Sequence, residues 1–315
     1  MVSLATPDVL VLGEILVELS STEPLDAGVA LTLNFSGDAL NAAAASAAAG
    51  AHTALLARVP DDELGDRRLE RVVALGIDTT QVLRVKGQHG LYLQHADPAG
   101  AREFTYVRRG SAGSGLSPGD VPLELVAKAG AVLASGIACA ISPLSAKAVR
   151  VAAATARCFV YDPNWRPRLV DAQGAAEHLR ALAPSTRLVT PAWPREAQFV
   201  SDSQDPVAVC AALRGLGVQA VALTRGVEGV LLDDGGELVE IPAIPAPAVV
   251  DQTGAGDSFA GTVAARLALG DPLIDAVRLG VAAASLSVGG LGGTGYVATL
   301  EESQAHAARA VEVCG

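Results

Sequence analysis

The sequence has little positive charge and few aromatic residues. Its 23 lysines and arginines face 34 aspartates and glutamates, which gives a formal net charge of −11 over 315 residues. No block of basic residues offsets this balance, so nucleic acids and anionic membranes are excluded as expected partners. Lysine occurs only at Lys86, Lys128 and Lys147. Arginine therefore carries most of the positive charge, and its side chain suits bidentate binding of carboxylates and phosphates.

Cysteine pairs, a secretion signal and long apolar runs are also missing. The 4 cysteines form no C-x-x-C pair, which indicates reduced thiols in a cytoplasmic protein. The N-terminus has no basic region followed by an apolar segment, and the alanine-rich stretch 39–57 is interrupted by polar residues. We therefore expect neither a signal peptide nor a membrane span. The pattern G-x-x-x-x-G-K-[ST] is absent too, which excludes a P-loop kinase.

Strand and helix patterns alternate along the chain, most regularly after residue 118. Short apolar runs that end in polar residues or glycine predict buried strands at 8–14, 53–59, 131–136, 158–162, 188–190 and 220–224. This alternation predicts an α/β fold, with a doubly wound, mostly parallel sheet and helices on both faces. Ligands of such sheets bind beyond the carboxyl ends of the strands. We expect Asn164, Thr224 and Asp257 to converge there.

Two segments, 14–35 and 82–110, have a different pattern. Polar and apolar residues alternate in them, as in half-exposed strands. We predict a single domain, residues 1–315, in which these two segments form a small sheet apart from the main one. An exposed sheet needs a cover for its other face, so a homo-oligomer that pairs two such sheets is expected.

The stretch 249–259 carries the strongest indication of chemistry. A polar, glycine-bearing turn leads into an apolar periodic run, 259–270, so Gly254, Ala255 and Gly256 are expected at a helix N-terminus. Free backbone N–H groups and the helix dipole favour an anion there, and small residues leave room for a phosphate. Asp257 is out of place in an anion site unless a metal, or a hydroxyl that it deprotonates, accounts for it. An isolated G-A-G-D is more simply explained as a helix cap after a loop.

Taken whole, 251–257 resembles the D-T-x-G-A-G-D signature of the ribokinase-like (PfkB) family of carbohydrate kinases, with Gln252 where the family most often has Thr. The resemblance implies that ATP is the phosphoryl donor and that Asp257 takes the proton from the sugar hydroxyl. The residues Gly254, Ala255 and Gly256 would hold the transferring phosphate. Some relatives need a monovalent cation, and the resemblance leaves open whether K⁺ binds near Asp251 and Thr253.

A second motif of the same family lies near the N-terminus. The stretch 36–41, Ser-Gly-Asp-Ala-Leu-Asn, resembles the sugar-binding motif G-G-x-x-x-N, with Ser36 replacing the first glycine. The resemblance implies sugar contacts at Gly37, Asp38 and Asn41, beneath a lid formed by 14–35 and 82–110. Standing alone, this motif would be an ordinary polar helix start.

The stretch 106–112 points to a narrower group of relatives. Tyr-Val-Arg-Arg-Gly-Ser-Ala resembles the Y-Y-R-x-x-S-A segment of 2-keto-3-deoxygluconate kinases, with Val107 in place of the second tyrosine. The resemblance implies that Tyr106 and Arg108 hold the acid end of the sugar and that Tyr92 is a further substrate contact. An arginine suits a planar carboxylate. Packing within the lid is the alternative explanation for both tyrosines.

The stretch 161–167 is similar to the D-x-N-x-R segment of the same branch. The resemblance implies that Asn164 faces the nucleotide phosphates and that Arg166 lies between phosphate and sugar acid. An arginine there can neutralise charge that develops during phosphoryl transfer. As a bare loop at a strand end, the segment would be unremarkable.

Two further segments complete the nucleotide half. The stretch 224–229 resembles the nucleotide loop of the family, which implies contacts at Thr224, Gly226 and Gly229. Glu196 matches the glutamate of an N-x-x-E motif that positions Mg²⁺, commonly through water, although Trp193 replaces the asparagine. The run 290–295 fits G-x-G-x-x-G, but it follows an apolar helical run rather than a strand, so it does not predict an NAD site.

These observations together predict a carbohydrate kinase that uses ATP and Mg²⁺ in the cytoplasm, most simply with 2-keto-3-deoxygluconate as its small-molecule partner. One alternative is a kinase of another sugar such as fructose, in which Arg108 would have no carboxylate to meet. The other is a catalytically silent sugar-binding regulator that has kept the fold.

Overall fold

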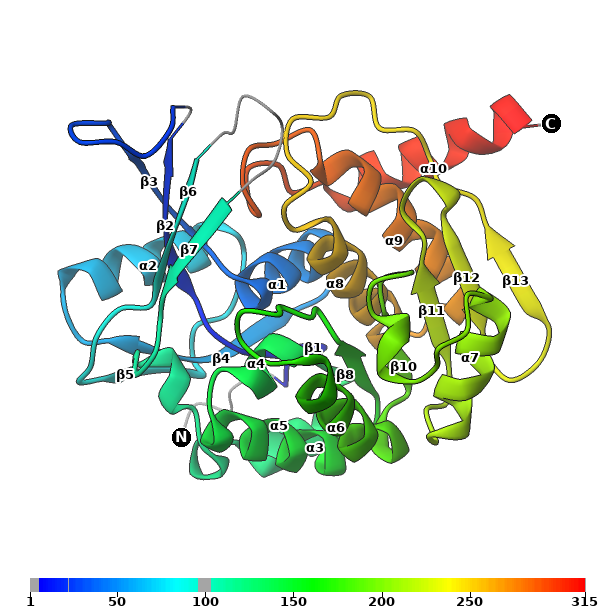
Figure 1. The fold of residues 1–315 in the computed structure, drawn as a ribbon, viewed down its shortest axis with the longest axis horizontal. Helices are drawn as coiled ribbons and strands as arrows, with labels where there is room; N and C mark the ends of the chain where they lie inside the picture. The colour runs from blue at the N-terminus through cyan, green and yellow to red at the C-terminus, as the bar shows by residue number, and fades with distance from the viewer. Residues whose placement is uncertain (1–5, 22, 96–102, 315) are drawn as a thin grey trace.

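The computed structural model describes residues 6–21, 23–95 and 103–314, and a large twisted sheet organises them (Figure 1). Its strand order is β13-β12-β11-β10-β9-β8-β1-β4-β5. The strands from β11 to β5 run parallel, whereas β12 and β13 are added antiparallel at one edge. The strands are β1 (Val9–Leu12), β4 (Thr53–Pro60), β5 (Val82–Val85), β8 (Ala131–Ser135), β9 (Phe159–Asp162), β10 (Leu188–Val189), β11 (Val221–Thr224), β12 (Val230–Asp233) and β13 (Leu238–Ile241).

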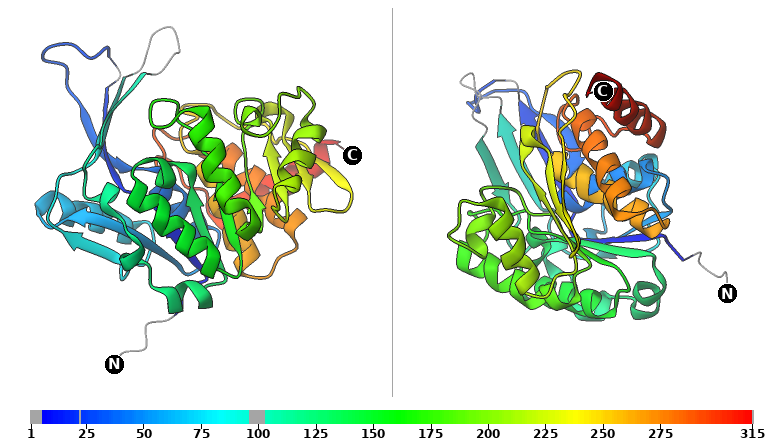
Figure 2. Two further views of the ribbon diagram at one scale, coloured as in Figure 1. Left: turned by 60° about the horizontal axis from the view of Figure 1, so that its bottom comes forward. Right: turned by 90° about the vertical axis from the view of Figure 1, so that its right-hand side faces the viewer.

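Helices cover both faces of this sheet, as the edge-on view in Figure 2 shows. One face carries α1 (Asp38–Ala48), α2 (Glu63–Ala74), α8 (Ala255–Ala268) and α9 (Leu273–Ser287), with α10 (Leu300–Cys314) packed outside α9. The other carries α3 (Leu123–Lys128), α4 (Gly136–Ala140), α5 (Pro143–Thr155), α6 (Ala172–Leu182) and α7 (Pro206–Gly215). Short 3₁₀ turns occupy Gly113–Gly115, Pro118–Asp120, Ala183–Ser185, Ala197–Phe199 and Gly226–Glu228. The predicted doubly wound α/β fold is confirmed.

The central strand β1 shows how the sequence divides its apolar residues between two cores. Val9 and Val11 pack into the core under α1, α8 and α9, whereas Leu10 and Leu12 pack into the core under α5 and α6. All four side chains are buried. A strand that packs against helices on both faces needs apolar residues at every position. The continuous apolar run in this sequence therefore predicts a strand in the middle of the sheet.

A second, small sheet with the order β3-β2-β6-β7 stands out from the body of the molecule (Figure 2). It comprises β2 (Leu16–Ser21), β3 (Thr32–Ser36), β6 (Leu91–His95) and β7 (Glu103–Val107). Sequence analysis wrongly included 82–85 in this sheet, because these residues form β5, which pairs with β4 at the edge of the large sheet. Polar and apolar residues alternate in a half-exposed edge strand of either sheet, so this alternation cannot show to which sheet residues 82–85 belong. The described part of the chain contains no helix both long and apolar enough for a membrane span.

Candidate active site

A cavity at the carboxyl ends of the central strands gathers the predicted acidic residues. It is lined by the carboxyl ends of β1, β8 and β9 and by the starts of α1 and α8, including Asp38, Ser135, Asp162 and Asp257. Chain segments far apart in sequence meet here because parallel strands bring their carboxyl ends to one edge. Of the three residues expected to converge here, Asn164 contacts Asp257, whereas Thr224 contacts Pro191.

Asp257 lies in the first turn of α8 and is buried. Its Oδ2 accepts a hydrogen bond from Asn41 Nδ2 at 2.8 Å, and its Oδ1 accepts one from Asn164 Nδ2 at 2.8 Å. The helix begins four residues before the apolar run that predicted it, because Gly254 caps it in the left-handed conformation with φ 83°. A β-carbon on Gly254 would lie 2.9 Å from Gly293 Cα, whereas one on Gly256 would meet no atom within 4 Å. The open space at Gly256 is compatible with a phosphate approaching the turn.

The surroundings of Asp257 raise the pKa of its carboxyl group to about 6. Burial is the main cause, and the negative charge of Asp38 adds to it. The hydrogen bonds from Asn41 and Asn164 and the positive charge of Arg166 act in the opposite direction. The carboxylate is therefore ionised at neutral pH yet basic enough to accept a proton, which is what a general base requires.

The loop after β9 positions Asn164. Its backbone has φ 40°, in the left-handed region that asparagine tolerates better than most residues. Asp162 fixes this conformation, since its Oδ1 accepts a hydrogen bond from Asn164 N at 3.1 Å. The half-buried Arg166 follows, and its positive charge lowers the pKa of both Asp162 and Asp257. Strained backbone at such a place is typical of functional sites.

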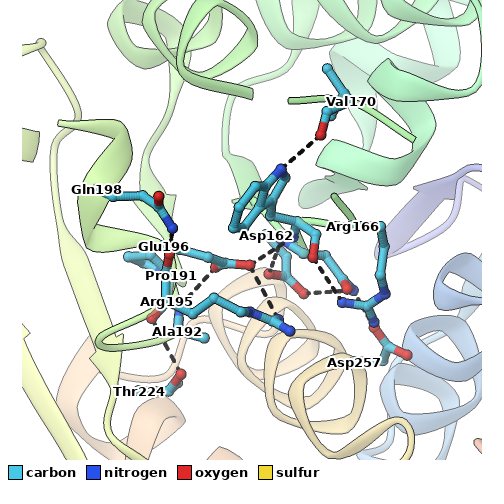
Figure 3. A network of polar contacts seen from close by, with 12 residues as sticks. Asp162, Arg166, Val170, Pro191, Ala192, Arg195, Glu196, Gln198, Thr224 and Asp257 are labelled. Carbon is cyan, nitrogen blue, oxygen red and sulfur yellow. Dashed lines mark hydrogen bonds and ion pairs between the residues drawn. The ribbon is translucent and has the colours of Figure 1, made fainter. Parts of the chain in front are cut away.

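Figure 3 shows a polar network that runs from Asp257 towards Thr224. Glu196, which is buried, accepts hydrogen bonds from Trp165 N at 2.6 Å and Ala192 N at 2.8 Å. Thr224 Oγ1 donates to Pro191 O at 3.2 Å. Burial raises the pKa of Asp162, the negative charges of Glu196 and Asp257 raise it further, and the positive charge of Arg166 offsets only part of this rise. The network links the ends of β9, β10 and β11 to the N-terminus of α8.

Three predicted nucleotide or metal positions have distinct surroundings. Both Glu196 oxygens hold backbone N–H groups, and no cluster of three metal-ligating side chains occurs within residues 6–21, 23–95 and 103–314. A contact through water therefore fits Glu196 better than direct coordination. A β-carbon on Gly226 would have no neighbour within 4 Å, but one on Gly229 would lie 2.1 Å from Ile241 O. The close approach of the chain before β12 to the end of β13 is thus enough to require glycine at position 229, and a nucleotide contact there stays a prediction.

The predicted sugar motif forms the start of α1. Gly37 caps the helix with φ 129°, where a β-carbon would lie 2.7 Å from Glu14 O. Asp38 accepts a hydrogen bond from the Ser135 hydroxyl, and burial raises the pKa of its carboxyl group. Asn41 donates to Asp257, so the motif also holds the candidate base.

The predicted lid residues lie on the small sheet and pack together. The rings of Tyr92 and Tyr106 are 5.9 Å apart, and the Tyr92 hydroxyl donates to Glu18. The Arg108 guanidinium lies 4.8 Å from the centroid of the Tyr106 ring. Arg108 is buried and forms an ion pair with Glu14, with 2.8 Å between Nη1 and Oε1. The contacts of both tyrosines agree with lid packing and leave a role in sugar binding as a prediction.

Sequence reasoning missed two parts of this site. The loop 290–295 was considered only as a dinucleotide motif, yet a β-carbon on Gly293 would lie 2.2 Å from Asn41 Nδ2. The Gly292 N–H donates to Asp251 Oδ2 at 2.9 Å, so the loop also contacts the signature 251–257. Glu14 was read only as the end of a strand. A charged residue directly after a buried strand was the signal that could have found it.

Comparisons with known proteins agree over nearly the whole chain. A model of the pfkB family carbohydrate kinases matches residues 6–299. The 2-dehydro-3-deoxygluconokinase of Thermoproteus tenax is 34% identical over 288 residues, 88% of this chain and 87% of that protein. The 2-dehydro-3-deoxygalactonokinase of Haloferax volcanii is 26% identical over 289 residues, 89% of this chain and 91% of that protein. A solved structure, a putative ribokinase II from E. coli in complex with ATP and Mg²⁺, has a TM-score of 0.86 at 23% identity and covers 96% of this chain and 99% of its own.

Proposed function

The chain belongs to the PfkB family of carbohydrate kinases, and we propose that it transfers the γ-phosphoryl group of ATP to the 6-hydroxyl of 2-keto-3-deoxygluconate, the substrate also called 2-dehydro-3-deoxygluconate. The observation that carries the catalytic part is the position of Asp257, held by Asn41 from one motif and Asn164 from another. The base thus lies where the predicted sugar and nucleotide halves meet.

The steps follow from the groups at the site. Asp257 takes the proton from the sugar hydroxyl as that oxygen bonds to the γ-phosphorus and the bond to ADP breaks. Backbone N–H groups of Gly254, Ala255 and Gly256 stabilise the phosphoryl group at the α8 N-terminus. Arg166, whose charge already acts on Asp257, offsets the negative charge that develops.

Magnesium fits the acidic wall of this site. Burial raises the pKa of the Asp162 and Asp257 carboxyl groups, and nearby negative charges add to it, those of Glu196 and Asp257 at Asp162 and that of Asp38 at Asp257. A bound cation would relieve this accumulation of negative charge. Glu196 would hold the ion through water, and Asp162 lies beside it in the same network (Figure 3). Mg²⁺ bound with ATP supplies charge neutralisation between the phosphates.

The choice of sugar acid is supported by Arg108 and by the relatives. Arg108 is a buried arginine next to Tyr106, and a planar carboxylate is the ligand that its fork of donors suits best. The Thermoproteus tenax relative, at 34% identity, is a 2-dehydro-3-deoxygluconokinase by name. The Haloferax volcanii relative makes 2-keto-3-deoxygalactonate a second candidate, which carries the same carboxylate.

The test is ADP release from Mg-ATP with 2-keto-3-deoxygluconate, 2-keto-3-deoxygalactonate, gluconate, fructose and ribose. We expect turnover of the two keto acids and little of the neutral sugars. Selective turnover of fructose or ribose would support a sugar kinase but contradict the proposal that Arg108 binds a sugar carboxylate. Sugar binding without any turnover would instead support the silent regulator.

Three accompanying proposals concern assembly, cation and location. The exposed apolar residues Leu33 and Val107 on the small sheet support pairing of two copies through their lids, which sedimentation would test.

The signature residues Asp251 and Thr253 contact each other, with 2.8 Å from Thr253 N to Asp251 Oδ1. A K⁺ requirement there is tested by exchanging K⁺ for Na⁺ in the assay. A need for ATP supports a cytoplasmic location.

A further inference from the structure

The ion pair between Glu14 and Arg108 joins the two sheets inside the predicted sugar site. Glu14 follows β1 of the large sheet, and Arg108 follows β7 of the small sheet. The side chain of Glu14 is 1% exposed and that of Arg108 is 6% exposed. The residue on which the choice of an acidic sugar rests is therefore already paired with a carboxylate of the protein.

This pair leaves hydrogen-bonding capacity unused. Among the described residues, Arg108 Nε and Nη2 have no hydrogen-bond partner, and neither do the two carboxylate oxygens of Glu14. The 2.8 Å contact is thus an ion pair without full hydrogen-bond geometry. Buried donors without partners are costly unless a ligand engages them. Two adjacent free N–H groups on a guanidinium fit a second carboxylate.

The charges around Glu14 make its own ionisation finely balanced. Burial is the largest influence and raises the pKa of Glu14 to about 7. The charges that act on it are Arg108 and Arg68, which lower this pKa, and Asp38, which raises it. Arg68 is engaged by the backbone, since it donates to Ile15 O at 3.1 Å and Gly90 O at 2.9 Å. Only Arg108 is left to exchange partners.

We propose that Glu14 is the positioning residue that sets the preference for charged sugars: ionised, it holds and neutralises Arg108, and on binding of a sugar carboxylate it takes up one proton and yields that charge to the substrate. The charge balances, because one carboxylate replaces another on the guanidinium while a proton from solvent neutralises the first. The inference rests on the proposed acidic substrate and adds Glu14 as the residue that controls its binding.

The reason for proton uptake is electrostatic. Without it, two carboxylates would share one buried guanidinium beside Asp38, and like charges at such distances disfavour joint ionisation. Binding of the acid therefore competes with ionisation of Glu14. Above about pH 7 the dissociation constant of a sugar acid should rise, approaching tenfold per pH unit. A sugar without a carboxylate has no such coupling.

The experiment is calorimetric titration of the full chain with 2-keto-3-deoxygluconate, without ATP, between pH 6 and pH 9. Pairs of buffers with different ionisation enthalpies report the protons taken up on binding. We expect proton uptake above pH 7 in the natural protein and the predicted loss of affinity. In the isosteric variant Glu14→Gln we expect neither, and tighter binding than the natural protein at pH 8. Glu70→Gln, on the exposed face of α2, is the matched control.

The outcomes separate this inference from the proposed function. Binding of the keto acid with no proton uptake and with constant affinity overturns the role of Glu14 and keeps the substrate. The same conclusion holds if Glu14→Gln retains the full pH dependence. Failure of the natural protein to bind any sugar acid at any pH, while it binds fructose or ribose, overturns the substrate itself. The measurement on the natural protein alone is decisive if the variant does not fold.

Discussion

Asn164 donates its side-chain amide to Oδ1 of Asp257 at 2.8 Å, although 93 positions separate the two residues in the chain. Asn164 was predicted on the nucleotide side and Asp257 as the base that acts on the sugar. Their contact fixes the carboxylate where the predicted sugar half meets the predicted nucleotide half. The predictions below test what this junction does.

The variant Asp257→Asn should lose nearly all turnover while it retains sugar binding. The substitution keeps the size of the side chain but removes the proton acceptor, and a general base contributes roughly 10²–10⁴-fold to the rate. ADP release measures the loss in kcat, and calorimetric titration measures the affinity for sugar. Turnover within a few-fold of the natural protein would show that another group takes the proton.

The activity should fall as the pH drops through about 6. Only ionised Asp257 can accept the sugar proton, and its pKa is raised to about 6, so the active form is lost below that value. The dependence of kcat/KM on pH measures this limb. In Asn41→Ala the limb should move to higher pH, because the removed hydrogen bond lowered the pKa of Asp257.

The matched control for that shift is Ser36→Ala. The Ser36 hydroxyl donates to Asn41 Oδ1 at 3.2 Å, and in the part of the chain that the structure describes Asp257 accepts from Asn41 and Asn164 rather than from Ser36. Its removal should leave the acid limb in place. An equal shift in both variants would attribute the effect to movement of α1 rather than to the lost amide.

The same carboxylate should make the protein less stable above about pH 6 than at pH 4. The pKa of Asp257 is higher in the folded state than the ordinary value of 3.8, so the folded state holds the proton more tightly. Stability is therefore lost as the pH rises from about 4 through 6. In Asp257→Asn the difference in the free energy of unfolding between pH 4 and pH 8 should become smaller by on the order of 1–2 kcal/mol, because asparagine does not titrate. Urea unfolding at pH 8 and pH 4 checks this, and an equal change from the natural protein at both values would contradict it.

The variant Gly256→Ala should separate folding from function. An added β-carbon meets no atom of the protein within 4 Å, and alanine favours a helix over glycine by about 0.5–1 kcal/mol. If the turn approaches the transferring phosphate, the methyl group blocks it, and kcat/KM for ATP should fall about tenfold or more. Gly215→Ala in α7, also free of neighbours, is the control that should gain stability and keep activity. Full activity in Gly256→Ala would show that the transferring phosphate does not bind at this turn.

The sequence predicted those structural features that depend on residues close to one another in the chain. The glycine turn 254–256, the cap of α8 and the alternation of the central strands depend on residues close in sequence, and the structure agrees with each. Assignment of 82–85 to the wrong sheet has the opposite cause, since a strand partner is chosen by distant residues. The ion pair of Glu14 was missed for the same reason, because its partner Arg108 follows a strand of the other sheet.

The division of β1 between two cores has a consequence for how this chain can change. Val9 and Val11 face one core and Leu10 and Leu12 the other, and Glu14 follows two residues later. Loss or gain of one residue in β1 would exchange small and large side chains between the cores and turn Glu14 to the opposite side of the sheet. A single-residue insertion or deletion within β1 should therefore disturb both cores and the site together, whereas a substitution there disturbs only one core.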